Sequence, residues 1–352
     1  MAEATIGDQI VHLAGMPTWI KRFASVALGI SGRSTLAEIW PNLCVTTVGG
    51  VNPRPYHRDL NRLILGAPDT SPRLLHSEVY NATEGFFAMQ IDEGEMALIP
   101  DVATFYEFAP LQDAQSGNFS RAVPLEGVGI DQEYALILSN PNGLWRYLIG
   151  DTVRFTATRP HRLQVSGRIN QSLNMTGEEL LVANTDAAIG AVCQALGLSL
   201  ADYLVIALKL EGPDENACHL WLVEVEGGAY GYGDSELAGR IAAGLDRELL
   251  AYHDYAKSRQ MGAHSGAAFS LSPPVVILLP PGSFYRWLQL RFGEALSTQS
   301  KVPRLTEDRE MVGELLRSLP ADVATTWAQL VSPRHRQAIT ALLTAKSQGG
   351  GV

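Results

Sequence analysis

Residues 80–85 combine three side-chain types that can do chemistry together. Tyr80 offers an aromatic face, Thr83 a hydroxyl and Glu84 a carboxylate within a few residues. Such a turn can stack a base, contact a phosphate and hold Mg²⁺, because magnesium prefers oxygen ligands that it shares with phosphates. A hydrogen-bonded surface turn explains the same residues equally well.

Three further positions offer complementary chemistry. Gly49-Gly50 follows a predicted strand and lets a flat ligand approach the backbone, although a plain turn is the simpler explanation of these glycines alone. Asp151 follows a glycine at a predicted strand end, where a carboxylate accepts hydrogen bonds from the two hydroxyls of a ribose or simply opens a loop. Lys301 lies in a polar loop before Pro303, either as solvated surface or as a mobile charge for a phosphate.

Length and composition limit the kind of protein that could carry these groups. A chain of 352 residues predicts two packed units with an ample core. The hydrophobic fraction of 46% and the charged fraction of 18% are those of an ordinary globular protein. The net charge is −10, from 27 Lys+Arg and 37 Asp+Glu, and no basic patch occurs. We therefore expect no nucleic-acid partner and no anionic membrane partner.

The lack of a recognisable targeting signal and the pattern of cysteines predict an intracellular protein. No apolar run is long enough to cross a bilayer, and the best, residues 275–279, is enclosed by prolines. The amino terminus lacks the basic flank and apolar core of a secretory signal, so the expected location is the cytoplasm. The cysteines are odd in number and widely separated, which favours reduced, buried thiols over disulfides or a zinc site: Cys44, Cys193 and Cys218.

The first hundred residues alternate between helical and strand patterns. Apolar residues recur at helical spacing over 17–29, and a second helix is predicted over 55–65. Strands are predicted over 43–48 and 74–80, the latter ending in a polar turn at 81–85. This alternation predicts an α/β sheet with a ligand at the strand ends.

The remainder of the chain is predicted to be β-rich and then α+β. The predicted strands of the β-rich part are 133–138, 144–149, 153–156 and 162–165, with a turn at 140–143. After a polar joint at 169–179, strands at 204–210 and 219–225 precede a helix capped by Asp234 or Ser235. Its apolar residues recur every four positions and form one stripe.

Taken in chain order, these segments resemble those of the adenylate-forming enzymes, specifically the auxin-responsive GH3 acyl-acid amido synthetases in their bacterial form. Each motif alone is weak, but the ordered set covers most of the chain and is specific. The motifs are AGMPTW at 14–19, EIWPNL at 38–43, EVYNATEGFF at 78–87, GLWRYLIGDTV at 143–153, SGR at 166–168, GEEL at 177–180 and KVPRL at 301–305.

The resemblance implies a nucleotide site with divided roles. Glycines and an aromatic ring would flank the adenine, and two neighbouring turn residues would complete the nucleotide-binding set: Gly49, Gly50, Tyr80, Asn81 and Ala82. Thr83 would contact the α-phosphate, and Glu84 would coordinate Mg²⁺. Asp151 would hold the ribose hydroxyls, and Gly167-Arg168 would begin a hinge beside the nucleotide. Lys301 would be the lysine that the second lobe brings to the α-phosphate region.

The implied fold is α/β: part of a large adenylate-forming amino-terminal domain, made of an α/β sheet and a β-rich subdomain, followed by a smaller α+β lobe. The expected division is 1–166 for the large domain, 167–345 for the lobe with the lysine, and 346–352 for a disordered tail. The Ser/Thr/Gly-rich phosphate loop that the family places upstream is not found, since residues 31–35 resemble it only superficially. The chain is then a fragment, one subunit completed by a separate polypeptide, or a protein that has lost ATP turnover.

The implied activity is that of a ligase that uses ATP and Mg²⁺. It would activate a small carboxylic acid as an acyl-adenylate and pass the acyl group to an amine, such as an amino acid, forming an amide. Two alternatives stay open: a thiol acceptor such as coenzyme A, and a non-catalytic subunit that binds nucleotide or acid. Three residues would line the acyl pocket if they are not ordinary core: Met16, Trp19 and Phe86.

Overall fold

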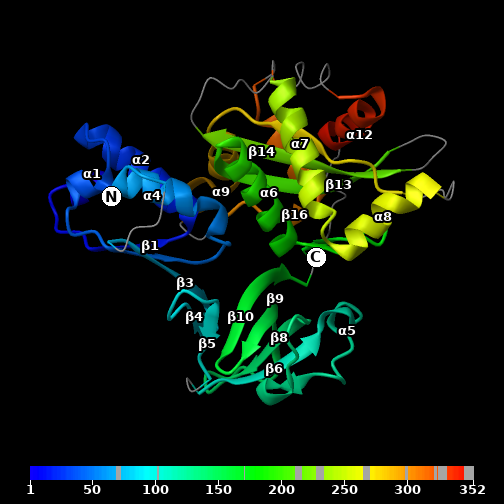
Figure 1. Cartoon of the computed structure of the whole chain (residues 1–352), viewed down its shortest axis with the longest axis horizontal. Helices are drawn as coiled ribbons and strands as arrows, with labels where there is room; N and C mark the ends of the chain where they lie inside the picture. Colours follow the sequence, from blue (N-terminus) through cyan, green and yellow to red (C-terminus); the bar gives the residue numbers. More distant parts are fainter. Residues whose placement is uncertain are drawn as a thin grey trace. The chain divides into compact units, whose positions relative to one another are not determined.

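The chain forms two compact units, Met1–Asn170 and Gln171–Val352, each of which mixes helices and strands (Figure 1). The predicted α/β class is thereby confirmed. The computed structural model describes residues 1–68, 73–100, 103–169, 171–210, 216–226, 234–264, 270–297, 300–320, 323 and 331–344. The turn expected at 212–214 and the tail expected at 346–352 lie outside the described residues. None of the helices within these ranges combines the length and the apolar character needed to cross a bilayer.

The first unit begins as a small parallel sheet covered by helices. Strands β1 (His12–Gly15), β2 (Val45–Val48) and the first half of β3 (Leu75–Ala82) pair in parallel and in register. Helix α1 (Ala2–Thr5) precedes β1. The connecting helices are α2 (Pro17–Ser31), α3 (Leu36–Ile39) and, after the short η1 (Arg54–Tyr56), α4 (His57–Leu65). The predicted helices over 17–29 and 55–65 are therefore confirmed.

Strand β3 joins this parallel part to the antiparallel remainder of one ten-stranded sheet. Its second half pairs antiparallel with β4 (Gly85–Met89), and the sheet order is β1-β2-β3-β4-β5-β10-β9-β8-β6-β7. The other elements are β5 (Met96–Leu98), β6 (Phe105–Pro110), α5 (Leu111–Gln115), β7 (Val123–Pro124), η2 (Leu125–Gly127), β8 (Glu133–Ser139), β9 (Tyr147–Thr158) and β10 (His161–Arg168).

The β-rich part of this sheet curls around an aromatic core. Phe87 of β4 and Tyr106 of β6 are five positions apart in the strand order, yet their ring centroids lie 6.3 Å apart. In a flat sheet that separation would be about 24 Å, at about 4.8 Å per strand. Phe108 and Phe155 pack edge to face at 4.9 Å in the same cluster. The curl brings side chains from distant strands together, which the site described below requires.

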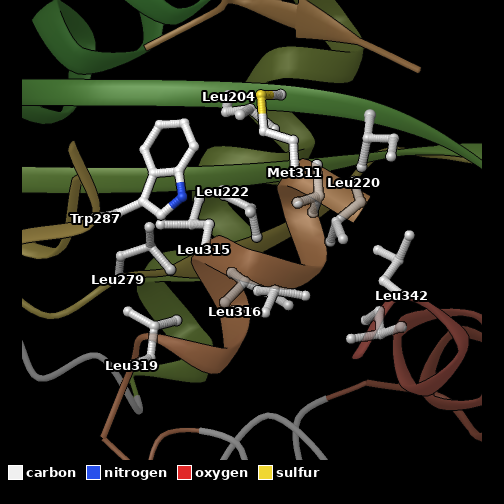
Figure 2. Close-up of a cluster of buried hydrophobic side chains, with 14 of the residues drawn as sticks. Leu204, Leu220, Leu222, Leu279, Trp287, Met311, Leu315, Leu316, Leu319 and Leu342 are labelled. Atoms are coloured by element: carbon white, nitrogen blue, oxygen red, sulfur yellow. The ribbon is translucent and has the colours of Figure 1, made fainter. Parts of the chain in front are cut away.

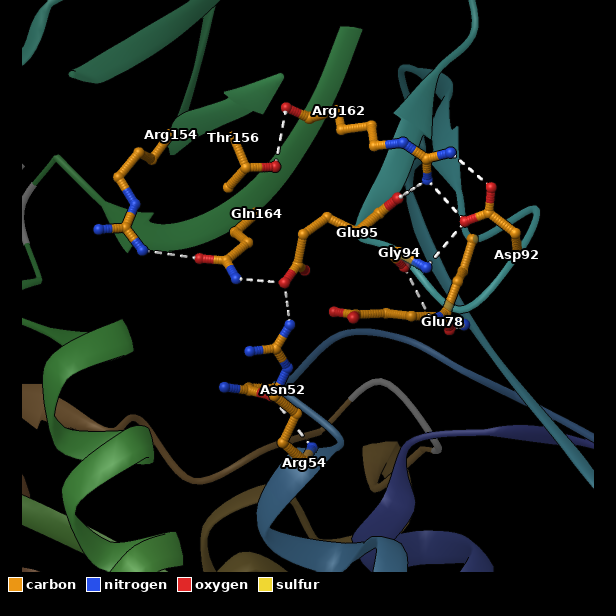
Figure 3. Close-up of polar contacts among 11 residues, drawn as sticks. Asn52, Arg54, Glu78, Asp92, Gly94, Glu95, Arg154, Thr156, Arg162 and Gln164 are labelled. Carbon is orange, nitrogen blue, oxygen red and sulfur yellow. Dashed lines mark hydrogen bonds and ion pairs between the residues drawn. The ribbon is translucent and has the colours of Figure 1, made fainter. Parts of the chain in front are cut away.

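A polar network on the first unit connects the helical part to the curled strands. Figure 3 shows Arg54 of η1 paired with Glu95, which accepts a hydrogen bond of 2.7 Å from Gln164 of β10. Arg154 of β9 donates to Gln164 at 2.9 Å, which extends the network to a second strand. Because Arg54 is more than half exposed, we expect a modest contribution to stability from its ion pair.

The second unit is a four-stranded sheet covered on both faces. Its order is β15-β14-β13-β16, formed by β13 (Ser199–Lys209), β14 (Ala217–Glu226), β15 (Val275–Leu278) and β16 (Leu305–Thr306). Alternate residues of β13 and β14, such as Leu204 and Leu222, face one large core beneath α9 (Ser283–Phe292), α10 (Arg309–Arg317) and α12 (Pro333–Thr344) (Figure 2).

The opposite face of that sheet carries other helices. These are α6 (Val182–Leu196), which contacts Tyr203 of β13, and α7 (Ser235–Leu249), which packs on α6 and β15. The predicted cap of α7 is confirmed, since Asp234 accepts a hydrogen bond of 2.9 Å from the amide of Leu237. Other elements among the described residues of this unit are a two-stranded ribbon of β11 (Ser172–Leu173) and β12 (Leu180–Leu181), the helix α8 (His253–His264) and the short η3 (Gly293–Ala295).

Two sequence predictions about the fold were wrong, and one was too broad. The turn expected at 81–85 is present but contains only two residues, because Ala82 pairs with Gly85. The strands expected at 144–149 and 153–156 form one strand, β9, because Gly150 continues it with a φ of +90°. Cys44 is exposed, whereas Cys193 and Cys218 are buried as expected, because Cys44 precedes β2 at the surface.

A buried ion pair fastens α2 to α4. The Lys21 ammonium lies 3.0 Å from Asp59 Oδ2 and 5.6 Å from the centroid of the Tyr56 ring. The Lys21 side chain is 1% exposed and that of Asp59 10%. Removal of either charge would leave the other buried without its partner, which is far more costly than removing both.

We predict that Lys21→Met lowers the free energy of unfolding by about 3–5 kcal/mol, whereas Lys21→Met combined with Asp59→Leu recovers most of the loss. Urea unfolding followed by circular dichroism measures both. The control is Arg62→Met on the exposed face of α4. A single variant as stable as the parent chain would show that this pair does not hold the helices together.

Candidate functional site

The sequence predicts Asp151 at a strand end. In the structure, Asp151 lies instead within β9, at an irregularity in the pairing of that strand. Leu148 pairs with Ile137 of β8, but the next pair is Thr152 with Ala135, so residues 149–151 oppose a single residue of β8. The register of β9 with β10 also shifts at this level. Bulges of this kind redirect side chains and are common beside functional sites. Here the bulge directs Asp151 toward side chains of two other strands.

The Asp151 carboxylate receives one hydrogen bond on each oxygen. Tyr80 of β3 donates its hydroxyl to Oδ2 at 2.9 Å, and Arg168 of β10 donates Nε to Oδ1 at 2.9 Å. Arg168 also donates Nη2 to the carbonyl of Ile149 at 3.3 Å. Each carboxylate oxygen retains capacity for another donor. The arrangement therefore presents an oriented acceptor at the end of β10.

Tyr80 is a buried donor. Its side chain is among the buried core residues, and its ring packs at a tilt against Phe87, with centroids 5.0 Å apart. Burial, and then the neighbouring Asp151, raise the pKa of Tyr80 well above its ordinary value. The phenol therefore stays protonated and keeps its hydrogen bond to Asp151 throughout the neutral range. Its place beside an adenine stays a prediction.

The glycine pair is required by packing within the protein. A Cβ at Gly49 would lie 2.8 Å from the carbonyl oxygen of Val79 on β3. Gly50 has a φ of +81°, and a Cβ there would lie 3.1 Å from Cγ of Met16. Because β1, β2 and β3 run in parallel, the glycines follow β2 beside the β3 segment that carries Tyr80. The predicted site residues Gly49, Gly50 and Tyr80 therefore lie on, or directly after, the neighbouring strands β2 and β3.

The hairpin turn between β3 and β4 carries the predicted phosphate and metal residues. Thr83 donates its hydroxyl to Glu84 Oε2 at 2.8 Å, and the side chain of Asn140 donates to the Glu84 carbonyl at 3.1 Å. The Glu84 charge adds, after burial and Asp151, to the raised pKa of Tyr80. Sequence reasoning missed the role of Asn140, because it reads as an ordinary turn residue.

Whether a metal ion fits at this turn depends on which ligands other than protein side chains it brings with it. Among the described residues, no group of three or more His, Cys, Asp or Glu side chains could hold a metal ion. Mg²⁺ bound with a nucleotide usually takes only one or two carboxylates, with phosphate oxygens and water as its other ligands. The single carboxylate of Glu84 fits that type of site.

The other predicted site residues occupy different environments. Asn81 is exposed and Ala82 packs against the aromatic core. Met16 is buried before α2, Trp19 is half-buried on α2, and Phe86 is 41% exposed on β4. Their place in an acyl pocket stays a prediction. Phe87, which sequence reasoning did not select, is the aromatic residue that supports Tyr80.

Lys301 belongs to the second unit, where it is exposed on the segment that leads into β16. The residue after it, Val302, is buried in the large core, and Arg304 is buried as well. The segment is thus anchored immediately after the lysine. Gln299, which belongs to the same predicted loop, lies outside the described residues.

We predict that Gly49→Ala lowers the free energy of unfolding by about 1–3 kcal/mol, because its Cβ would force β2 away from β3. The matched control is Gly29→Ala on the exposed face of α2, where a Cβ meets nothing within 4 Å and improves helix propensity. Thermal unfolding of both variants measures the difference. Equal stability of the two would contradict the close approach of β2 and β3.

Comparisons with known sequences place both units in one family. Residues 97–168 match the GH3 family central domain, and residues 183–310 match the GH3 family C-terminal domain. The chain is 24% identical over 300 residues to the indole-3-acetic acid-amido synthetase GH3.10 of Arabidopsis thaliana, covering 79% of this chain and 47% of that protein. It is 26% identical over 300 residues to the probable indole-3-acetic acid-amido synthetase GH3.9 of Oryza sativa subsp. japonica, covering 80% and 64%.

Solved structures share the fold. The GH3.15 acyl acid amido synthetase superposes with a TM-score of 0.65 at 14% identity, over 89% of this chain and 64% of that one. A 2-hydroxyisobutyryl-CoA ligase in the postadenylation state, bound to 2-HIB-AMP, superposes with a TM-score of 0.55 at 14% identity, over 90% and 58%. The chain thus spans between about half and two thirds of the length of these relatives. It has the mixed α/β fold of adenylate-forming enzymes and belongs to the GH3 family.

Proposed function

We propose that this chain is an ATP-dependent ligase, or the larger part of one, that activates a small carboxylic acid as an acyl-adenylate and conjugates it to an amine such as an amino acid. The observation that carries the proposal is the Asp151 carboxylate, oriented by Tyr80 and Arg168 within the stretch that matches the GH3 central domain. The names of its curated relatives, indole-3-acetic acid-amido synthetases, support the same reaction class.

The proposed role of Asp151 is to bind the ribose. The two hydroxyls of a ribose donate to the remaining lone pairs of a carboxylate, provided that the carboxylate is held in one orientation. Tyr80 and Arg168 supply that restraint from opposite oxygens. The glycines after β2 lie beside the segment of β3 that carries Tyr80, in keeping with their predicted place beside the adenine.

The proposed chemistry proceeds in two transfers. In the first, a carboxylate oxygen of the acid attacks the α-phosphorus of ATP, and pyrophosphate leaves. In the second, an amine nitrogen attacks the acyl carbon, AMP leaves and the amine loses a proton. Thr83 and Glu84 face the phosphates in this proposal, and Mg²⁺ held by Glu84 would offset the charge that builds at phosphorus. Lys301 supplies a second positive charge to the α-phosphate from the second unit.

The phosphate loop is the part of the proposed site that the 352 residues do not supply. Backbone amides around a triphosphate both position it and stabilise the leaving pyrophosphate. We therefore infer that full activity needs a Ser/Thr/Gly-rich segment beyond this sequence, contributed by a longer chain or by a separate polypeptide. Assays of the proposal are best made with and without that segment.

We predict that Asp151→Asn weakens ATP binding at least about tenfold, because it replaces a charged acceptor by an amide. Isothermal titration calorimetry measures the affinity. Asp113→Asn is the control, since both oxygens of Asp113 likewise accept a hydrogen bond, in this case from Arg121 in the same unit. Unchanged ATP affinity in the Asp151 variant would remove the ribose assignment.

We predict that Lys301→Ala slows acid-dependent exchange of pyrophosphate into ATP by about 10²–10³-fold, as the loss of one charge-stabilising group usually does. Its unfolding should be unchanged, because the side chain is exposed. Lys257→Ala, at an exposed position on α8, is the control. A variant that exchanges at the parent rate would refute the catalytic role.

The product separates the proposal from its alternatives. An amide formed with an amino acid supports the ligase as proposed, whereas a thioester formed with coenzyme A identifies the thiol as acceptor. A chain that binds nucleotide but exchanges no pyrophosphate, even with the phosphate-loop segment added, would be a non-catalytic subunit.

A further inference from the structure

Arg304 is one of the few charged residues buried in the second unit. It is 4% exposed and lies at the end of the segment that leads from Lys301 into β16. Strand β16 contains only two residues, Leu305 and Thr306, which pair with Val205 and Ile206 of β13 at the edge of the sheet. So short an edge strand is weakly held by its own backbone pairing. Other contacts must fix this segment.

The guanidinium of Arg304 makes those contacts with β13. Its Nη1 donates to Asp202 Oδ1 and, at 3.2 Å, to the carbonyl oxygen of Tyr203. Its Cζ lies 4.6 Å from the centroid of the Tyr203 ring. The Arg304 carbonyl accepts a hydrogen bond of 2.8 Å from the amide of Val205. Side chain and backbone thus hold the same residue against one strand.

The same guanidinium reaches α6. Its Nε lies 3.6 Å from Asp186 Oδ1, and that oxygen accepts a hydrogen bond of 2.7 Å from the Tyr203 hydroxyl. Thr185 lies 2.9 Å from the same hydroxyl, and the Tyr203 ring stacks on Trp221 of β14 at 5.5 Å. Burial raises the pKa of Asp186 to about 6, so this carboxylate depends on its partners to remain charged near neutral pH.

We propose that Arg304 is a positioning residue that fixes the backbone from which Lys301 is displayed, by anchoring the 300–304 segment to β13 and α6 at once. The inference rests on the catalytic role proposed above for Lys301. A lysine at position 304 could not reproduce it, because a point charge cannot bond two oxygens in a plane and also cover an aromatic ring. Val302, buried in the large core, holds the segment from its other side.

The first test needs no enzymatic activity. Amide hydrogen exchange of the whole chain, followed by mass spectrometry, compares the parent with Arg304→Met and with the milder Asp202→Asn, which retains the arginine. We expect exchange over residues 300–306 to accelerate about tenfold or more, while the amides of β14 keep their protection. Arg291→Met is the matched control, since Arg291 is an exposed arginine on α9 that pairs with Glu314 at 2.5 Å. Uniform acceleration throughout the second unit, or none over 300–306, would overturn the proposal.

The second test uses pyrophosphate exchange with the phosphate-loop segment present. Arg304→Met should lower kcat at least about tenfold with the KM for ATP within about twofold, and Arg304→Lys should fall between it and the parent. Adding Arg304→Met to Lys301→Ala should lower kcat little further, because both changes remove the contribution of the Lys301 charge. Full additivity would show that Arg304 acts independently of Lys301 and would overturn the proposal. A parent chain without exchange activity would instead count against the proposed function, while hydrogen exchange still decides the anchoring.

Discussion

The hydrogen bond from Tyr80 to Asp151 depends on the curl of the large sheet. The strands that carry these residues, β3 and β9, are separated in the strand order by β4, β5 and β10. In a flat sheet they would lie about 19 Å apart, well beyond the reach of a tyrosine side chain. The two atoms are nevertheless 2.9 Å apart. The aromatic core, in which Phe87 and Phe108 contact rings from other strands, is what holds the sheet in this curled form.

This dependence couples packing to chemistry in the first unit. A carboxylate can hold a ligand in one orientation only if it is itself held, and Asp151 obtains its restraint from a buried phenol and from the last residue of β10. The bulge at Gly150 adds the change of direction that a regular strand would not allow. A site of this kind is built from the strands, and its geometry changes if the core beneath it changes.

In both units, buried charged side chains lie where two or more elements meet and join those elements to one another. Lys21 and Asp59 join two helices, and Arg304 joins the segment before β16 to β13 and α6. Burying a charge is costly unless its partners are in place, so each of these contacts favours one arrangement of the elements over others. The exposed pairs in Figure 3, by comparison, add less to stability.

The sequence by itself determined the family, the α/β class and the helices α2, α4 and α7, because these depend on local periodicity, on capping residues such as Asp234 and on the order of short motifs. It also selected Asp151 and Tyr80, since their types suit a nucleotide. Only the tertiary structure decided that these two contact each other, that β9 continues through Gly150, and that Arg304 is buried beside Asp186. Each of these facts depends on residues tens of positions apart meeting through sheet curvature and packing, which no local pattern in a single chain encodes.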